Sequence, residues 1–306
     1  MSPRVVLLSG GVGGARFAHG LARVVPAERL TIVVNTGDDF THWGLRICPD
    51  LDTVMYTLAG VADAAQGWGV AGESFATHEQ IQRLGGETWF RLGDRDLATH
   101  LLRTESLAGG ETLSQVTARL AEALEVGPRL LPMSDAPQPT RVVTDADGVL
   151  DFQPWLVRRR AEPLARALLY GGDGSSAPGV CEALLHADLV LLAPSNPYVS
   201  IDPILRLNGV RDALSGKVVV GVSPIVGGRA VKGPLATMLG SVEGRAVTAG
   251  AVASHYGDLL SGWVVERGDE ATVEGGAVMG TETIMGREDD RRRLADETLK
   301  FAEGLQ

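Results

Sequence analysis

The sequence predicts an α/β protein with a Rossmann-like, three-layer α/β/α fold, a parallel sheet as its core, and an inserted cap region of helices and a hairpin. Residues 4–34 have the pattern of a strand, a glycine loop, a helix and a second strand, which begins a βαβ unit and implies parallel pairing. Residues 188–193 and 217–222 are continuously apolar, as strands buried on both faces are. The 306 residues are enough to bury a sizeable core.

The individual elements follow from periodicity and from turn and cap residues. In the first half we expect strands at 4–8 and 30–34, helices at 15–25, 53–60, 73–84 and, after a capping box at Thr112, 112–124, and a hairpin of 141–144 with 149–155. In the second half we expect strands at 188–193, 217–222, 246–248 and 263–266, and helices at 204–214, 235–239 and 288–305.

The predicted hairpin interrupts the alternation of strands and helices, which resumes only near residue 165. We therefore expect the nucleotide-binding core to consist of residues 1–60 and 165–306. Residues 61–164 would form the inserted cap region.

Composition and charge exclude several classes of protein. The net charge is −10, which argues against a nucleic-acid partner because such proteins need a basic surface. No apolar run approaches the roughly 18 residues of a membrane span, so we expect no membrane partner. Two cysteines, Cys48 and Cys181, form neither a disulfide framework nor a zinc pattern. They suit a reducing compartment, and we expect a cytoplasmic protein.

The first candidate site is the glycine loop after the first strand, with glycines at positions 10, 11, 13 and 14. Glycines between a strand and a helix let backbone N–H groups approach a phosphate at the positive end of the helix. The dinucleotide fingerprint fits only in part, because Arg16 stands where the third glycine would be. We therefore interpret Gly10, Gly11, Gly13 and Gly14 as phosphate-binding, with a tight turn without ligand as the alternative.

The second candidate site is a group of four carboxylates within fifteen residues, comprising Asp38, Asp39, Asp50 and Asp52. They follow the second predicted strand, at the sheet edge where ligands of open α/β proteins bind. Clustered carboxylates repel one another unless a cation joins them, and hard oxygen ligands beside a phosphate site suit Mg²⁺. Two alternatives stay open: Asp50 or Asp52 caps a helix, or one acid binds the ribose of NAD.

Polar loops follow two later strands and should reach the same sheet edge. Ser195 and Asn196 come directly after 188–193, and Ser223-Pro-Ile-Val-Gly-Gly228 follows 217–222, with Arg229 and Lys232 beyond it. Because the carboxyl ends of parallel strands meet at one edge, we expect these loops and the glycine loop to share one crevice.

Seven motifs, taken in order, resemble the 2-phospho-L-lactate transferase family, and the similarity extends from residue 4 to about residue 260. They are Ser-Gly-Gly-Val-Gly-Gly (9–14), Val-Val-Asn-Thr-Gly-Asp-Asp (33–39), Cys-Pro-Asp-Leu-Asp-Thr (48–53), Leu-Gly-Asp-Arg-Asp-Leu-Ala-Thr-His (92–100), Leu-Pro-Met-Ser-Asp (131–135), Ala-Pro-Ser-Asn-Pro (193–197) and Ser-Pro-Ile-Val-Gly-Gly (223–228). Arg-Ile-Cys-Pro-Asp at 46–50 is more similar to the bacterial, actinobacterial-type branch than to the archaeal one.

The resemblance implies an Mg²⁺-dependent phosphotransferase of coenzyme F-420 biosynthesis that works as a homodimer. In this family the deazaflavin alcohol Fo (7,8-didemethyl-8-hydroxy-5-deazariboflavin) attacks the β-phosphorus of a guanosine diphosphate ester. GMP leaves, and the phospho-lactyl or phospho-enolpyruvyl group ends on Fo.

The family's functional residues carry over to matching positions of this sequence. Asp52 and Arg91 match Fo contacts, and the family often has Lys at the position of Arg91. Asp38 and Asp52 match metal-binding and catalytic carboxylates, and Asp39 or Asp52 is expected to accept the proton of the Fo hydroxyl. The four glycines, Ser195 and Asn196 match nucleotide-binding loops.

Two other functions share part of this pattern. One is a non-catalytic regulator of the same fold that binds a nucleotide sugar or dinucleotide, but such relatives lack the Leu-Gly-Asp-Arg-Asp element at 92–96. The other is an NAD-dependent dehydrogenase, against which the missing third glycine and the number of carboxylates count.

Overall fold

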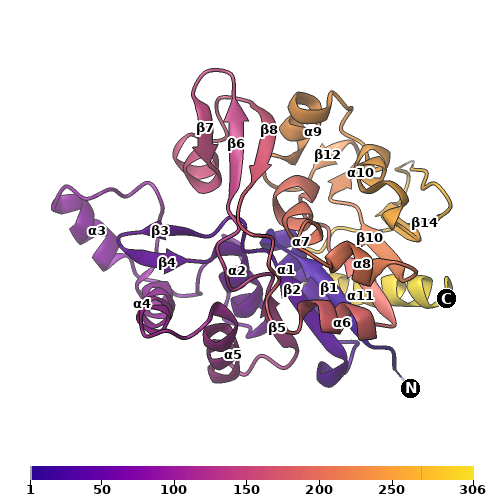
Figure 1. Ribbon diagram of the computed structural model, residues 1–306, viewed down its shortest axis with the longest axis horizontal. Coiled ribbons are helices and arrows are strands. Elements are labelled where there is room, and N and C mark those ends of the chain that lie inside the picture. The colour runs from indigo at the N-terminus through magenta and orange to yellow at the C-terminus, as the bar shows by residue number, and fades with distance from the viewer. Residues whose placement is uncertain (1, 270) are drawn as a thin grey trace.

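A seven-stranded, all-parallel sheet with the order β14-β13-β10-β9-β1-β2-β5 forms the centre of the fold (Figure 1). The computed structural model describes residues 2–269 and 271–306. The sheet confirms the predicted Rossmann-like α/β core. Its strands in chain order are β1 (Val5–Ser9), β2 (Leu30–Val34), β5 (Arg129–Pro132), β9 (Leu189–Leu192), β10 (Val218–Val222), β13 (Gly262–Glu266) and β14 (Ala277–Thr281).

Helices cover both faces of this sheet, and the side chains of β1 show why. Val5 and Leu7 pack into one hydrophobic cluster, whereas Val6 and Leu8 pack into another on the opposite face. Successive side chains of a strand alternate between faces, so a continuously apolar strand needs a helical layer on each side. The first layer contains α1 (Gly11–Leu21), α2 (Pro49–Leu58), α5 (Leu113–Ala123) and α11 (Glu288–Glu303). The second contains α6 (Val180–His186), α7 (Asp202–Leu205), α8 (Val210–Leu214), α9 (Leu235–Glu243) and α10 (Ala249–Tyr256).

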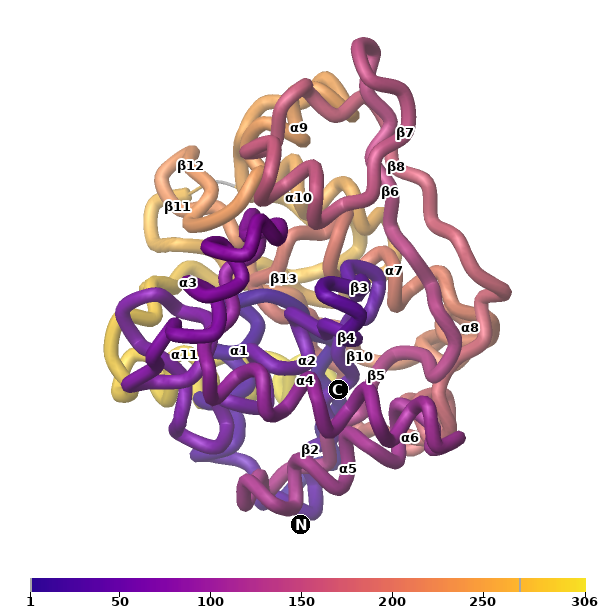
Figure 2. The backbone as a smooth tube through the Cα atoms, turned by 90° about the vertical axis from the view of Figure 1, so that its left-hand side faces the viewer, coloured from indigo at the N-terminus to yellow at the C-terminus, as the bar shows by residue number. Residues whose placement is uncertain are grey.

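Three small antiparallel sheets lie outside the central sheet. One pairs β3 (Phe40–His42) with β4 (Leu45–Ile47), and a second has the order β7-β6-β8 and contains the predicted hairpin. The third pairs β11 (Ile225–Val226) with β12 (Arg229–Ala230). Figure 2 shows the second of these sheets beside α9. Its strands are β6 (Thr140–Thr144), β7 (Gly148–Asp151) and β8 (Ala165–Tyr170).

Two further α-helices and four short helical turns complete the described elements. The helices α3 (Ala76–Arg83) and α4 (Asp94–Ala108) extend to the left of the core in Figure 1 beside β3 and β4. The capping box predicted at Thr112 is present and begins α5. The short turns are η1 (Ala27–Arg29), η2 (Pro154–Arg158), η3 (Pro197–Ile201) and η4 (Gly257–Leu259).

Two predicted elements are wrong. Residues 204–214 form two short helices, α7 and α8, because Gly209 adopts a left-handed conformation with φ of 79° and ends any continuous helix there. Residues 246–248 form no strand. They precede α10, whose first turn is capped by the Thr248 hydroxyl accepting from the Ala251 N–H at 3.0 Å.

The division into core and cap region stays a prediction, and strand pairs join segments on either side of its boundaries at residues 60 and 165. β5 lies within 61–164 but is the edge strand of the central sheet, next to β2. β8 lies after residue 164 but pairs with β6 of the hairpin.

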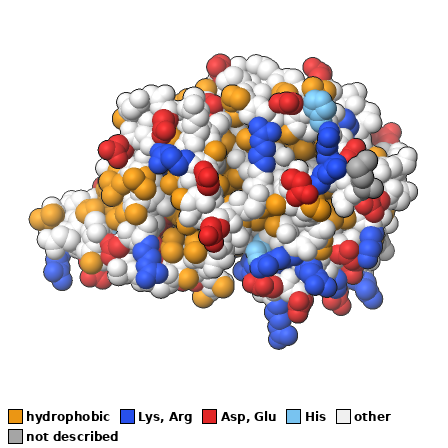
Figure 3. Space-filling model, turned by 90° about the horizontal axis from the view of Figure 1, so that it is seen from below, with side chains coloured by type: hydrophobic (Ala, Val, Ile, Leu, Met, Phe, Trp, Pro, Cys, Tyr) orange, Lys and Arg blue, Asp and Glu red, His pale blue; other side chains and the backbone are white. Residues whose placement is uncertain are grey.

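Two surface properties bear on partners. None of the helices in residues 2–269 and 271–306 combines the length and apolar composition that crossing a membrane requires. The face drawn in Figure 3 carries basic and acidic side chains interspersed, so that face offers no extended basic surface.

Candidate active site

The glycine loop stands at the junction of β1 and α1: Gly10 lies between them, and Gly11, Gly13 and Gly14 lie in the first turn of α1. A Cβ atom on Gly13 would lie 2.5 Å from the carbonyl oxygen of Pro194, and one on Gly14 would lie 2.8 Å from Ser195 Oγ. The Ser195 hydroxyl donates to the Gly10 carbonyl at 2.7 Å. The loops after β1 and β9 therefore meet, as the sequence predicts, and these glycines are needed for that close approach.

Asp38 and Asp50 come together through Asn35. The Asn35 side-chain amide donates to Asp50 Oδ2 at 2.9 Å and to Asp38 Oδ1 at 3.2 Å. The Gly11 N–H donates to Asp50 Oδ1 at 2.7 Å, and the Gln153 amide donates to Asp38 Oδ2 at 2.9 Å. Asp50 thus connects the carboxylate group to the start of α1, where the helix dipole favours negative charge.

Burial perturbs both carboxyl groups of this pair. Burial raises the pKa of Asp38 well above its usual range, and the charge of Asp50 raises it further. Burial raises the pKa of Asp50 to about 6, although hydrogen bonds from Asn35 and Gly11 oppose the shift. Among the described residues, neither carboxylate has an ion-pair partner. Two buried acids without a positive partner form a site that favours a bound cation.

A first cavity of about 410 Å³ opens in front of this pair. Gly10, Gly11 and Gly13 line it on one side, together with Ser195 and Asn196. Asp38 and Asp50 line it as well, and the long basic side chains of Arg16 and Lys232 add positive charge. Except for Gly14, which packs behind the loop, every residue predicted to bind nucleotide lines this cavity.

A second cavity of about 300 Å³ adjoins the first and has a different character. Its walls include four aromatic side chains, and its polar residues include Asp52, Arg91, Asp96 and His100. Pro49, Thr53 and Trp68 line both cavities and form the wall between them. The aromatic residues of the second cavity are Tyr56, Trp68, Trp89 and Phe90.

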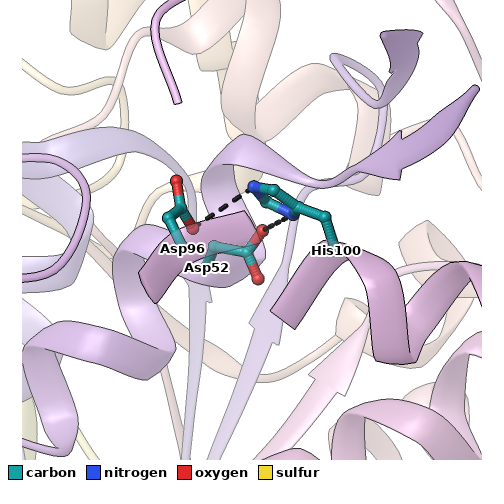
Figure 4. Close-up of side chains that lie close together, drawn as sticks. All are labelled: Asp52, Asp96 and His100. Atoms are coloured by element: carbon teal, nitrogen blue, oxygen red, sulfur yellow. Dashed lines mark ion pairs between the residues drawn. The ribbon is translucent and has the colours of Figure 1, made fainter. Parts of the chain in front are cut away.

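Asp52 belongs to a buried ionic network at the base of the second cavity (Figure 4). Both of its carboxylate oxygens accept hydrogen bonds from Arg103, one from Nη1 at 3.0 Å and one from Nη2. His100 lies between two acids, with Nδ1 3.6 Å from Asp52 and Nε2 3.2 Å from Asp96. The Tyr56 hydroxyl donates to Asp96 at 2.8 Å.

This network differs from the Asp38–Asp50 pair because it already contains a cation. Asp52, Asp96 and His100 offer three ligand atoms within 4.8 Å of one another, a spacing that a metal ion could use. Arg103, however, is 1% exposed and holds Asp52 through both carboxylate oxygens, so it already balances the charge of that acid. Of the two groups, the Asp38–Asp50 pair is therefore the better candidate for a metal.

The structure separates Asp39 from the other predicted site residues. Its side chain is 1% exposed, pairs with Arg46 at 3.0 Å and lines neither cavity. Burial raises the pKa of Asp39 to about 7, against the opposing charge of Arg46. Arg91 does line the second cavity, and its guanidinium lies 3.6 Å from the centre of the Phe75 ring.

Sequence reasoning missed several residues of this site. Asn35 stands inside a recognised motif, but its role as the link between two acids depends on the fold. Arg103 follows Asp96 by seven residues and His100 by three, spacings that place all three on one helix face, which is a signal that could have been used. Gln153 and Trp68 come from distant segments and give no local signal.

The chain matches known proteins over most of its length. The model of the family described as "2-phospho-L-lactate transferase CofD" matches residues 5–298. A phosphoenolpyruvate transferase of Thermobifida fusca is 48% identical over 288 residues, covering 89% of each chain. One of Streptomyces griseus is 47% identical over 280 residues, covering 89% of this chain and 88% of the relative. One of a Mycobacterium species (strain KMS) is 44% identical and covers 92% and 93%.

Solved structures support the fold. Two crystal structures of a UPF0052-family protein from Bacillus halodurans superpose with TM-scores of 0.63 and 0.64 at 14% identity. They cover 97% and 98% of this chain and 99% and 100% of theirs. At that identity the similarity concerns the fold alone. The family match and the curated relatives confirm the family that the motifs resemble, and the chain is a transferase that belongs to the 2-phospho-L-lactate transferase family.

Proposed function

We propose that this transferase moves a phospho-enolpyruvyl or phospho-lactyl group from a guanosine diphosphate ester to the hydroxyl of Fo and releases GMP. The two adjoining cavities with a common wall carry this proposal. One has a glycine loop, carboxylates and basic side chains, which suit a nucleoside diphosphate. The other has aromatic walls, which suit a flat deazaflavin ring. The name of the relatives, phosphoenolpyruvate transferase, favours the enolpyruvyl donor.

The reaction needs alignment and charge neutralisation more than covalent help from the protein. The Fo hydroxyl oxygen forms a bond to the β-phosphorus, and the bond from that phosphorus to the oxygen bridging to the α-phosphate breaks. The bridging oxygen leaves with GMP, and the hydroxyl proton goes to a carboxylate. Of the two predicted acceptors, only Asp52 lines the second cavity, so we assign the proton to Asp52.

Asp38 and Asp50 fit the Mg²⁺ that the family implies. They are buried, face one cavity, and lack an ion-pair partner among the described residues. The sequence paired Asp38 with Asp52 as metal ligands, but Asp52 lines the other cavity and bonds to Arg103. We therefore assign the ion to Asp38 and Asp50. When bound, Mg²⁺ would neutralise phosphate charge, while the Gly11 N–H holds Asp50 in place.

A fluorescence titration with Fo, with and without Mg²⁺ and GDP, tests this assignment against its alternatives. We expect saturable binding of Fo and of GDP. Binding of NAD(H) with no response to Fo would favour a dehydrogenase, and nucleotide-sugar binding without transfer would favour a regulator. The cytoplasmic location and the homodimeric assembly rest on the sequence and stay predictions.

A further inference from the structure

Two basic side chains face the first cavity without an acidic partner. Arg16 comes from α1, and Lys232 comes from the segment between β12 and α9. Within residues 2–269 and 271–306, neither forms an ion pair with a carboxylate, and the Arg16 guanidinium donates to the carbonyl of Met285 at 3.5 Å. Burial and the nearby charge of Arg16 both lower the pKa of Lys232. Cations that repel each other across an open cavity favour an anionic occupant.

Lys232 also contacts a loop that lies far from it in the sequence. Its ammonium donates to the Gln66 carbonyl at 3.2 Å. Gly67 packs beneath it, because a Cβ atom there would lie 2.8 Å from Lys232 Nζ and 3.1 Å from Val12 of the glycine loop. The next residue is Trp68, which belongs to the wall between the two cavities.

The Trp68 loop, residues 63–69, is otherwise held mainly by its own turn. Asp63 accepts hydrogen bonds from the backbone N–H groups of Ala65 and Gln66 at 2.9 and 3.0 Å. The Asp63 N–H donates to the Gly69 carbonyl at 3.1 Å, which closes the loop on itself. The contact with Lys232 connects this loop, and with it Trp68, to the segment that precedes α9.

We propose that Lys232 is a positioning residue that couples the two substrates. Its ammonium binds the diphosphate of the donor while it holds the Gln66 carbonyl, so that donor binding fixes Trp68 and completes the acceptor cavity. An ammonium group has three N–H donors, and the Gln66 carbonyl uses one of them. The remaining donors are available to phosphate oxygens. The inference rests on the proposed function, and it predicts that donor and acceptor bind cooperatively.

The test measures the coupling between GDP, a donor analogue that cannot transfer its group, and Fo. The dissociation constant of Fo is measured by its fluorescence in the absence of GDP and at saturating GDP, with Mg²⁺ throughout. We expect GDP to tighten Fo binding by roughly fivefold or more, a typical coupling between sites, and Fo to tighten GDP binding equally.

Three variants of the full chain locate the coupling. Lys232→Met keeps the aliphatic stem but loses the charge, and we expect its coupling factor at saturating GDP to fall to about one. Gly67→Ala disturbs the same contact from the loop side, because alanine is strained at a φ of 76° and its methyl group would displace Lys232 Nζ, which lies 2.8 Å from that position. Arg229→Met is the matched control, since Arg229 stands three residues earlier, in β12, is exposed and lines neither cavity. It should keep the wild-type coupling.

Each result decides a different point. If Lys232→Met weakens GDP binding but keeps the coupling at saturating GDP, Lys232 only binds phosphate and the inference is wrong. Independent binding of GDP and Fo to the wild-type protein would overturn the inference and leave the proposed function standing. Failure of the wild type to bind either molecule would overturn both. Unchanged thermal unfolding of Lys232→Met would show that lost coupling does not reflect lost fold.

Discussion

Replacing Arg103 by methionine should destabilise the protein more than any change to an exposed arginine. Arg103 is 1% exposed and gives both carboxylate oxygens of Asp52 a charged hydrogen-bond donor. Removing it leaves a buried carboxylate without its counter-charge, which typically costs about 3–5 kcal/mol. Because proteins of this kind have unfolding free energies of about 5–15 kcal/mol, the loss should be a large part of the total.

Urea unfolding followed by circular dichroism measures this loss, provided that the slope of the free energy against urea is unchanged. Arg119→Met is the matched control. Arg119 pairs with Glu111 at 2.9 Å, but the two side chains are 47% and 43% exposed, so the expected loss is only about 0–1 kcal/mol. The double variant Arg103→Met/Asp52→Asn removes both charges together. It should recover most of the stability lost in Arg103→Met, because no unpaired charge then remains buried.

Two results would refute this reasoning. A loss below about 1 kcal/mol in Arg103→Met would mean that Asp52 is solvated or that His100, its neighbour in Figure 4, is a sufficient partner without Arg103. A double variant that loses as much as the two single variants added together would show that the two side chains do not interact. In either case the assignment of Asp52 to a preorganised acceptor site would lose its physical basis.

Three further predictions follow from the same structure. Asp38→Asn and Asp50→Asn should each abolish turnover while leaving circular dichroism and thermal unfolding near wild type; near-normal activity in either would contradict its role. Gly13→Ala should lower the free energy of unfolding in urea by about 1–3 kcal/mol, because its methyl group meets a backbone carbonyl. Gly240→Ala in helix α9 meets no other atom and should raise that free energy by about 0.5–1 kcal/mol. Equal effects of the two substitutions would contradict this prediction. Burial lowers the pKa of His255, but its acidic neighbours raise it by more, so the pKa is raised overall. The protonated imidazole therefore stabilises the fold fully below about pH 6.5, and this stabilisation is lost as the pH rises through the raised pKa. His255→Gln should remove this pH dependence from unfolding curves measured between pH 6 and 9.

The predictable part of the site is the part that depends on local order along the chain. β1, the glycine loop and β2 are consecutive, so their arrangement follows from residues 4–34 alone. Ser195 could be placed at the same edge because β9 is a continuously apolar strand and the loop after it must leave at the carboxyl end. The places of Gln153 and Trp68 could not be predicted from the sequence, because their segments approach the site only in the complete fold.

A correct prediction of the start of α2 would have separated two of the four acids, Asp50 and Asp52, from the sequence alone. We expected a helix from residue 53, but α2 begins at Pro49, which places Asp50 and Asp52 inside its first turn. Residues two apart on a helix do not face the same way, so Asp50 lines the first cavity and Asp52 the second. Asp38 and Asp39 are adjacent in the sequence, but only Asp38 lines the first cavity. Asp39 lies buried against Arg46, and no pattern in the sequence tells the two apart.

We propose that the two cavities hold a donor and an acceptor for one phosphoryl transfer. The most direct measurement supplies the purified protein with Mg²⁺, enolpyruvyl-2-diphospho-5'-guanosine and Fo, and follows GMP and the deazaflavin product by mass spectrometry. We predict that GMP appears only when Fo is present, in equal amount to a product whose mass is that of Fo plus the phospho-enolpyruvyl group. The lactyl ester in parallel reports the donor preference. GMP release at the same rate without Fo, or no product from either ester, would contradict the account.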